Sequence, residues 1–354
     1  MIVMTKELSS KISNVSFVCA CLVVFIHVSS VKMDLRLSNF IFEWIQTEMT
    51  GVAVPLFLII SGLLLGRHIN EEGWYRRAII SRVKSLVVPF FMLNLLWFPV
   101  ICLIHYIGAR YFGADGSNDR IHFTFYNFIY GVGLIPWGGG VVVGLWYVRA
   151  LFYLVLLSPL FAWFIRRGRL LSGVLIIVLL GLWCLQSRIH FASASMVEAM
   201  SYTFCMRCPL FFSIGMACAL WAPNSLPRNS AIIFVPISAG VLFWTKNHSF
   251  TDLSILTLVK FSTTVLLAIA IWSLTPSSKW PKCFIGNSFQ VFVLHGMILY
   301  LLPIPMKAIG IWDQIINKCG LLPVFVLTVF IAISVAEILK RSFPRFAYVV
   351  FGGR

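Results

Sequence analysis

Apolar side chains dominate the chain in long runs that are separated by short polar segments. A transmembrane α-helix needs about 20 predominantly apolar residues, and ten runs reach or approach that length. They lie at residues 13–30, 50–66, 86–107, 141–164, 170–187, 202–221, 230–245, 254–274, 284–302 and 320–339. The second, seventh and ninth runs are short or interrupted by Pro or Gly. The pattern predicts an all-α, polytopic integral membrane protein with about ten transmembrane helices in a single domain over residues 1–354.

The composition agrees with this pattern. Hydrophobic residues make up 60% of the 354 residues and charged residues 11%, and the mean hydropathy is +0.92. A typical soluble domain has about 25% charged residues. No stretch of 40 residues or more is polar enough to form a soluble domain of its own. Membrane lipid is therefore the expected surrounding of the whole chain.

The distribution of charge predicts the orientation in the membrane. If the N-terminus is placed in the cytoplasm, the inner segments carry 17 of the 28 Lys and Arg residues but 4 of the 12 acidic residues. Because cytoplasmic loops are enriched in Lys and Arg, we expect ten helices with both termini cytoplasmic. The net charge of +16 is then a topology signal. Nucleic-acid binding would need cations on a soluble face beside base-stacking aromatics, so no nucleic-acid partner is expected.

One histidine stands out in the first apolar run. His27 ends a stretch in which almost every other side chain suits lipid. If the helix starts near Lys11 or Ser13, His27 lies roughly 20 Å along a hydrocarbon core about 30 Å thick. Ionisable groups at such depth mark functional sites, and imidazole can accept and return a proton near neutral pH. The alternative is a histidine that is hydrogen-bonded to a neighbouring helix for packing.

Three cations lie inside predicted spans. Arg149 is about eight residues into the fourth span, and Arg207 and Lys260 are each some six residues into theirs. The few carboxylates that could pair with them are Glu43, Glu48, Glu198 and Asp252. A buried cation without a carboxylate needs another anion or carbonyl dipoles, and a phosphate-bearing ligand would serve. Lys260 can snorkel to the interface, whereas the depth of Arg149, roughly 12 Å, favours a ligand or catalytic role.

Polar residues also occur in and after the second span. Ser61 and Gly62 follow each other in an apolar helix, where small residues permit close helix contact. The basic stretch that follows contains Arg76, Arg77, Arg82 and Lys84. It could bind anionic lipid headgroups or the phosphates of a cytosolic nucleotide-like cofactor. The alternative is that the stretch only sets the orientation of the protein in the membrane, which requires neither ligand.

The nine cysteines do not predict a metal or redox site. Seven fall in apolar spans, where a thiol behaves as a small hydrophobic group. Cys205 and Cys208 have CxxC spacing, but no second pair accompanies them. No metal-ligand cluster, nucleotide-binding glycine loop or Ser-His-Asp order is evident, and no metal is expected.

Six short stretches together resemble the integral-membrane acyltransferase 3 family, which O-acetylates surface polysaccharides and related cell-envelope glycans. They are residues 22–27 (LVVFIH), 54–62 (VPLFLIISG), 82–90 (RVKSLVVPF), 145–151 (LWYVRAL), 211–215 (FFSIG) and 292–295 (FVLH). Each stretch is weak alone. Their order and spacing over most of the chain, together with ten helices, make the resemblance fairly specific.

The resemblance implies roles for particular residues. His27 matches the first-helix histidine that is essential to acyl transfer in the family. The family often has a basic residue eleven positions earlier, where this chain departs from the pattern with Ser16. Arg82 and Lys84 match the basic stretch that faces the cytoplasmic donor, and Arg149 matches an arginine of one branch of the family.

The late-helix histidine of the family corresponds to His295. Together with Trp146, which precedes Arg149 in the matched stretch, and Arg207, it is a candidate for binding the acceptor. Ser61 and Arg77 are candidates for the donor site beside the matched basic residues.

The expected reaction moves an acetyl group from cytosolic acetyl-CoA to a hydroxyl of an envelope glycan or lipid-linked sugar at the outer side. His27 would remove the proton of the attacking hydroxyl, a role worth about 10²–10⁴-fold. Arg149 could stabilise the oxyanion or hold a phosphate, and Arg82 and Lys84 would hold the phosphates of CoA. We expect direct transfer, since no base positioned for a covalent route through Ser61 is apparent.

The competing interpretation is a transporter or flippase of a lipid-linked sugar or another anionic solute. Such a protein would more often have internal repeats and broken helices at matching places. The two halves of this chain are not convincingly similar, and no intramembrane Asp or Glu relay is evident. A structural or sensory protein would leave His27 and Arg149 unexplained. The acceptor sugar, the length of the acyl group and the oligomeric state stay open at this point.

Overall fold

The computed structural model of the protein describes residues 5–29, 51–112, 124–125, 128–129, 142–192, 205–221, 231–247, 252–312, 314 and 321–353. Within these ranges every regular element is helical and no strand occurs. The prediction of an all-α protein is therefore confirmed for the described part of the chain. Glu43, Glu48 and Glu198, which were considered as partners of the buried cations, lie outside these ranges.

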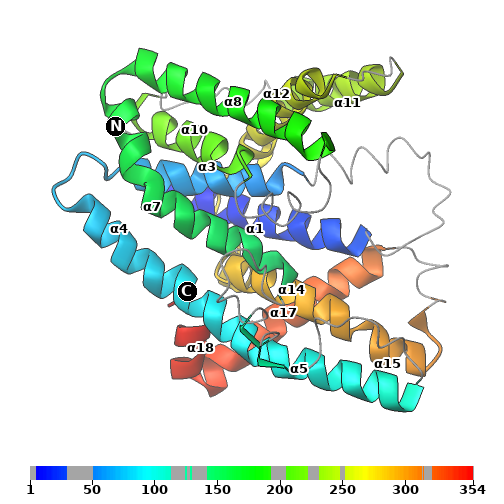
Figure 1. The fold of residues 1–354 in the computed structure, drawn as a ribbon. Helices are drawn as coiled ribbons and strands as arrows, with labels where there is room; N and C mark the ends of the chain where they lie inside the picture. Colours follow the sequence, from blue (N-terminus) through cyan, green and yellow to red (C-terminus); the bar gives the residue numbers. More distant parts are fainter. Residues whose placement is uncertain are drawn as a thin grey trace.

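The helices form one bundle, with α1 in its middle (Figure 1). In chain order they are α1 (Lys6–Ser29), α3 (Ala53–Gly66), α4 (Trp74–Arg82), η2 (Val83–Val87), α5 (Val88–Phe112), η4 (Val143–Leu145), α7 (Trp146–Arg166), α8 (Arg169–Ala192), α10 (Arg207–Trp221), α11 (Ala231–Asn247), α12 (Leu253–Leu274), α13 (Lys282–Ile285), α14 (Ser288–Leu301), α15 (Pro303–Ala308), α17 (Leu322–Ser342) and α18 (Pro344–Val350). Helix α1 packs against α3, α14 and α17, and α3 in turn packs against α10.

Each of the ten predicted runs falls on a helix. Seven helical stretches in the described residues are long and apolar enough to cross a membrane, and α3 and α10 are shorter apolar helices of 14 and 15 residues. Helix α11, on the seventh run, has 17 residues. The chain is thus a membrane protein with many apolar helices, while the number of ten spans and the cytoplasmic position of both termini stay predictions.

Glycines allow α3 and α10 to pack in close contact. A Cβ atom on Gly62 would overlap the carbonyl oxygen of Phe212, and one on Gly215 would overlap that of Ile59. Close backbone approach through small residues is a common means of joining helices in membranes. The interpretation of the Ser61–Gly62 step as a close helix contact is therefore correct for Gly62.

The basic stretch runs through α4 into a π-helical turn, η2. In η2 the N–H of Val88 donates to the carbonyl of Val83, five residues earlier, and Pro89 lacks the N–H that would continue an α-helical pattern. Single π-helical turns inside α-helices frequently mark functional sites. Here Arg82, which directly precedes the turn, is partly buried, whereas Lys84, inside the turn, is exposed.

Helix α7 begins inside the bundle. The 3-10 turn η4 precedes it, and Gly144 in this turn lies so close to the middle of α14 that an added Cβ would meet His295 Cε1 at 3.1 Å. Non-helical backbone is tolerated at membrane depth only where protein or a cavity surrounds it. Arg149 lies about eight residues into the fourth apolar run. Because α7 begins only at Trp146, it is in the first turn of the helix, and it is buried.

The first helix starts earlier than its apolar pattern indicates. Helix α1 begins at Lys6, one to two turns before Lys11 or Ser13. The cause is a cap, since the Thr5 hydroxyl accepts a hydrogen bond from the N–H of Leu8 at 3.1 Å, and a threonine at this position stabilises a helix start. His27 lies two residues before the end of this helix.

Candidate active site

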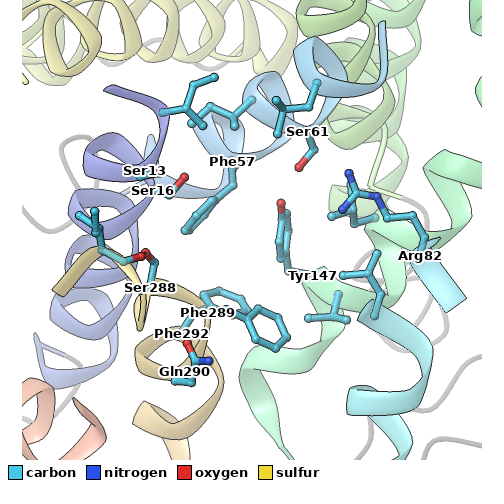
Figure 2. A pocket seen from close by; sticks show the side chains of 18 residues that line it. Ser13, Ser16, Phe57, Ser61, Arg82, Tyr147, Ser288, Phe289, Gln290 and Phe292 are labelled. Atoms are coloured by element: carbon cyan, nitrogen blue, oxygen red, sulfur yellow. The ribbon is translucent and has the colours of Figure 1, made fainter. Parts of the chain in front are cut away.

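A cavity of about 470 Å³ lies between α1, α3, the α4–η2 junction, α7 and α14 (Figure 2). Its lining comprises Ile12, Ser13, Ser16, Phe57, Ile60, Ser61, Leu64, Arg82, Leu86, Tyr147, Val148, Leu151, Ile285, Gly286, Ser288, Phe289, Gln290 and Phe292. The wall is mostly apolar with a few polar groups, which is typical of small-molecule and cofactor sites. The volume suits a ligand of drug-like or cofactor-arm size.

The polar groups of the cavity come from two sides. Ser61, Tyr147 and Arg82 line one side in Figure 2, while Ser16 and Ser288 line the other. No carboxylate of the described residues forms an ion pair with Arg82. A cation without a carboxylate beside an apolar cavity favours an anionic ligand.

Three aromatic side chains form a cluster at one end of the cavity. The ring centroids of Phe57 and Tyr147 are 5.8 Å apart, those of Phe57 and Phe292 are 5.8 Å apart, and those of Tyr147 and Phe292 are 5.5 Å apart. We call these three residues the aromatic cluster. All three also line the cavity.

Two histidines meet on the other side of Phe292. The rings of His27 and His295 have centroids 5.0 Å apart and are tilted by 32°, and the ring of Phe292 lies 6.1 Å from that of His295. Residues from α1 and α14 that are 268 positions apart thus form one pair, which we call the histidine pair. Phe292 contacts both the cavity and this pair.

The hydrogen bonding of His295 determines which of its nitrogens carries a proton. Its Nδ1 lies 2.5 Å from the carbonyl oxygen of Phe292, and because a carbonyl can only accept, Nδ1 must donate. His295 Nε2 is buried without a hydrogen-bond partner. In the neutral ring this atom carries a lone pair, so it can accept a proton or a hydrogen bond at the histidine pair.

The structure brings together only part of the predicted site. Arg82 and Ser61 line the cavity, and His27 and His295 form the adjacent pair. Ser61 and Gly62 therefore have different roles, since the serine faces the cavity and the glycine faces α10.

Arg149 does not line the cavity. It is 7% exposed and lines a neighbouring hollow of about 140 Å³, which shares Leu86 and Val148 with the cavity lining. The side chain interacts with other groups of the protein, although not through a hydrogen bond of Nε. Its catalytic role stays a prediction.

Arg77 and Lys84 lie outside the cavity lining, and both are exposed. Arg77 donates to Glu71 Oε2 at 2.7 Å and to the carbonyl of Glu72 at 2.7 Å. The hydrogen bond from His68, together with the nearby Arg77, lowers the pKa of Glu71 below its ordinary value. Arg77 thus stabilises the turn before α4 through these hydrogen bonds. Its contact with the acyl donor stays a prediction.

The two remaining acceptor candidates also lie away from the cavity lining. Trp146 is partly buried at the start of α7 and makes an edge contact with Tyr147, with centroids 6.4 Å apart. Arg207 begins α10, and its Nε is buried without a hydrogen-bond partner. Among the other residues discussed with the intramembrane cations, Asp252 is bound by Arg188 at 3.1 Å and caps α12.

Sequence reasoning missed several lining residues. Ser13 and Ser16 were not predicted as site residues, although their spacing from Ser9 puts all three on one face of α1. This spacing was a weak signal, because the same part of the helix also contains the polar residues Lys6, Glu7, Ser10, Lys11 and Asn14. No such signal was available for Tyr147, Ser288 and Gln290, because the direction of their side chains depends on how α7 and α14 pack.

A hydrogen-bond network holds the rim of the cavity at Gly286 and Ser288. The buried Asn287 donates to Glu337 Oε1 at 2.8 Å and to the carbonyl of Cys283 at 2.8 Å. Lys340 Nζ donates to Asn287 Oδ1 at 2.8 Å and to the carbonyl of Gly286 at 3.0 Å. The network ties the start of α14 to α17.

Asn287→Ala is expected to destabilise the protein by about 1–3 kcal/mol, because it removes the hydrogen bonds of a buried amide and leaves its partly buried partners Glu337 and Lys340 unsatisfied. Thermal unfolding in detergent would measure the change. Lys307→Ala, at an exposed site in α15, is the control and should leave the unfolding midpoint unchanged. Equal midpoints for the two variants would show that the network does not stabilise the rim.

A comparison with protein-family models identifies the family of the chain. The model of the acyltransferase 3 family, described as an acyltransferase domain, matches residues 14–337, a range that contains every lining residue of the cavity except Ile12 and Ser13, and both histidines of the pair. No curated protein and no solved structure matches the chain. Since the match covers nearly the whole sequence, the chain belongs to the membrane acyltransferase 3 family.

Proposed function

We propose that this acyltransferase moves an acetyl group from cytosolic acetyl-CoA to a hydroxyl of an envelope glycan or lipid-linked sugar at the outer side of a bacterial inner membrane. The observation that carries the proposal is the adjacency of two features. One is a cavity with an arginine free of carboxylates, and the other is a histidine pair beyond the aromatic cluster.

The predicted orientation is consistent with a donor that enters from the cytosol and an acceptor on the outer side of the membrane. Ser16 lines the cavity and lies eleven residues before His27 on α1, so the cavity and the histidine pair are separated by roughly 16 Å along the helix axis. With the N-terminus in the cytoplasm, the cavity is on the cytoplasmic side of the pair. A donor can enter from the cytosol while the acceptor hydroxyl approaches the pair from the outside.

The cavity suits the donor. The guanidinium of Arg82 would bind a phosphate of CoA, because charge-assisted hydrogen bonds from Arg to phosphate are strong and directional. The serine hydroxyls and the apolar walls would hold the pantetheine arm, which has amides separated by short carbon chains. The thioester would then reach the aromatic cluster, whose rearrangement would open the route to the histidine pair.

The chemistry at the histidine pair is a direct transfer. His27 would accept the proton of the acceptor hydroxyl while its oxygen attacks the thioester carbonyl. Collapse of the tetrahedral intermediate breaks the C–S bond, and the proton passes from His27 to the departing thiolate of CoA. His295 would orient His27 or the hydroxyl through its Nε2, and the first-turn amides of α7 supply positive potential for the developing oxyanion. Trapping of a stable acetyl-enzyme on any side chain would contradict direct transfer.

Incorporation of label tests the proposed function. Membranes that contain the protein would be incubated with radiolabelled acetyl-CoA and the envelope glycan fraction of the host, beside membranes without it. Alkali-labile label in glycan only with the protein present is expected. If the protein instead moves a lipid-linked sugar across vesicle membranes without transfer of label, the transporter interpretation is correct.

Arg82→Gln is expected to raise the KM for acetyl-CoA by about 10- to 100-fold with little change in kcat, because it removes a hydrogen bond to a charged group. Lys84→Gln is the matched control, two residues away in the same basic stretch but exposed and outside the cavity. Its KM should stay within about twofold of wild type, since exposed charges contribute little. Equal effects of the two variants would refute a specific donor contact of Arg82.

A further inference from the structure

A second hollow lies at the other end of α7, away from the cavity and the histidine pair. It has a volume of about 360 Å³ and is lined by Trp74, Tyr75, Pro159, Ala162, Trp163, Arg166 and Arg167. Helix α4 forms one wall and the last two turns of α7 form the other. The hydroxyl of Tyr75 donates to the carbonyl of Leu156 at 3.1 Å and joins the two walls.

Arginines at this end of α7 stack on tryptophans. The guanidinium carbon of Arg167 is 3.8 Å from the ring centroid of Trp163, and that of Arg166 is 5.7 Å from the centroid of Trp74. In the following turn, Arg169 lies 5.8 Å from the ring of Trp221. Stacking of this kind orients a guanidinium while leaving its N–H groups available for bidentate recognition of phosphate.

The cations of the hollow lack carboxylate partners. In the described part of the chain, neither Arg166 nor Arg167 forms an ion pair, and both side chains are exposed. A hollow that contains two oriented cations and no acid favours an anion.

An apolar stripe leads from the hollow along α7. Leu156, Leu160 and Trp163 follow one another at helical spacing, and they are 40%, 56% and 48% exposed. In a helix that crosses a membrane, such side chains contact acyl chains. The hollow is therefore continuous with the surface that faces lipid.

We propose that the hollow between α4 and the end of α7 binds one anionic phospholipid of the cytoplasmic leaflet. Its phosphate lies between Arg166 and Arg167, the tryptophan rings flank the headgroup, and the acyl chains follow Leu156 and Leu160. Basic pockets between transmembrane helices on the cytoplasmic side bind such headgroups. Aromatic residues at the same level suit the membrane interface. This site is independent of the acyl donor and of the proposed reaction.

Native mass spectrometry of the detergent-purified protein tests this site. The protein would be titrated with phosphatidylglycerol and with phosphatidylcholine of the same chains, in the absence of CoA. A single preferred phosphatidylglycerol adduct is expected for wild type. The double variant R166Q/R167Q should weaken it about 25-fold, since each cation near a lipid surface contributes about fivefold. The variant R341Q/R345Q, which removes two exposed cations of α17 and α18, is the control and should bind as wild type.

Two further variants keep the test decisive if R166Q/R167Q does not fold. R166K/R167K retains the charge but loses the planar stacking, and Trp163→Leu removes one ring while retaining both arginines. Each should weaken the adduct by several-fold. Equal weakening in R341Q/R345Q, or no preference for phosphatidylglycerol in wild type, would overturn the proposal.

Competition identifies the occupant. CoA and glycerol phosphate at millimolar concentration should leave the phosphatidylglycerol adduct in place, because neither has acyl chains to lie along Leu156 and Leu160. Displacement by CoA, with a matching loss of CoA binding in R166Q/R167Q, would assign the hollow to the donor nucleotide instead. Displacement by glycerol phosphate would reduce it to a phosphate site without a lipid. Both outcomes contradict the proposal.

Discussion

His27→Ala is expected to lower acetyl transfer by about 10²–10⁴-fold, the contribution of a positioned general base. The expectation rests on the histidine pair, in which the ring of His27 lies 5.0 Å from that of His295. His295→Ala should also lower the rate, because it removes the ring whose tautomer is held by the Phe292 carbonyl. Initial rates of label transfer from acetyl-CoA in membranes with matched protein levels would measure both effects.

The control for this prediction is another histidine inside the membrane bundle. His105 in α5 lies 2.7 Å from the hydroxyl of Tyr300 and belongs to neither the cavity nor the histidine pair. His105→Ala should retain most of the activity. If His27→Ala and His105→Ala lose activity to the same extent while both remain folded, His27 serves packing and the base lies elsewhere.

Gly215→Ala is expected to have the largest effect on folding. The added Cβ would overlap the carbonyl oxygen of Ile59 in α3, and because the obstacle is backbone, no side-chain rotation can relieve it. Overpacking of this kind costs about 3 kcal/mol or forces the helices apart. The recovery of monodisperse protein after solubilisation, together with the unfolding midpoint, would measure the loss.

Gly181→Ala in α8 is the matched control. No heavy atom lies within 4 Å of its added Cβ, and the φ angle of Gly181 is not positive. Since Ala is favoured over Gly inside a helix by roughly 0.5–1 kcal/mol, this variant should be at least as stable as wild type. If the Gly215→Ala and Gly181→Ala proteins had the same unfolding midpoint, the close contact between α3 and α10 at Gly215 would not be needed for stability.

The predicted spans and the observed helices agree because each span is a local property of the sequence. A run of apolar residues cannot be solvated by water, and in lipid its backbone groups must bond within the segment. The ends of the helices follow less local rules. Helix α1 extends back to a Thr5 cap, and α7 starts only at Trp146, after a 3-10 turn in which Gly144 lies against His295.

The candidate site was only partly predictable, because the neighbours of each side chain depend on how the helices pack and not on the local sequence. His27 and His295 were notable as polar groups in apolar runs, but their adjacency depends on how α1 and α14 pack. Arg82 and Lys84 are both basic residues of one stretch and look alike in the sequence, but only Arg82 lines the cavity. Arg149 had the signature of a site residue, yet it lies in a different hollow.

By itself, the sequence determined that this is an all-α membrane protein, which segments are apolar helices, and to which family of acyltransferases it belongs. These properties depend on local hydrophobicity and on short motifs read in order. Only the tertiary structure decided which polar side chains share a cavity, that Gly62 and Gly215 bring two helices together, and that arginines stack on tryptophans beside a second hollow. Such facts depend on helix rotation and on contacts between residues far apart in the chain, because a few degrees of rotation change which side chain faces a neighbour.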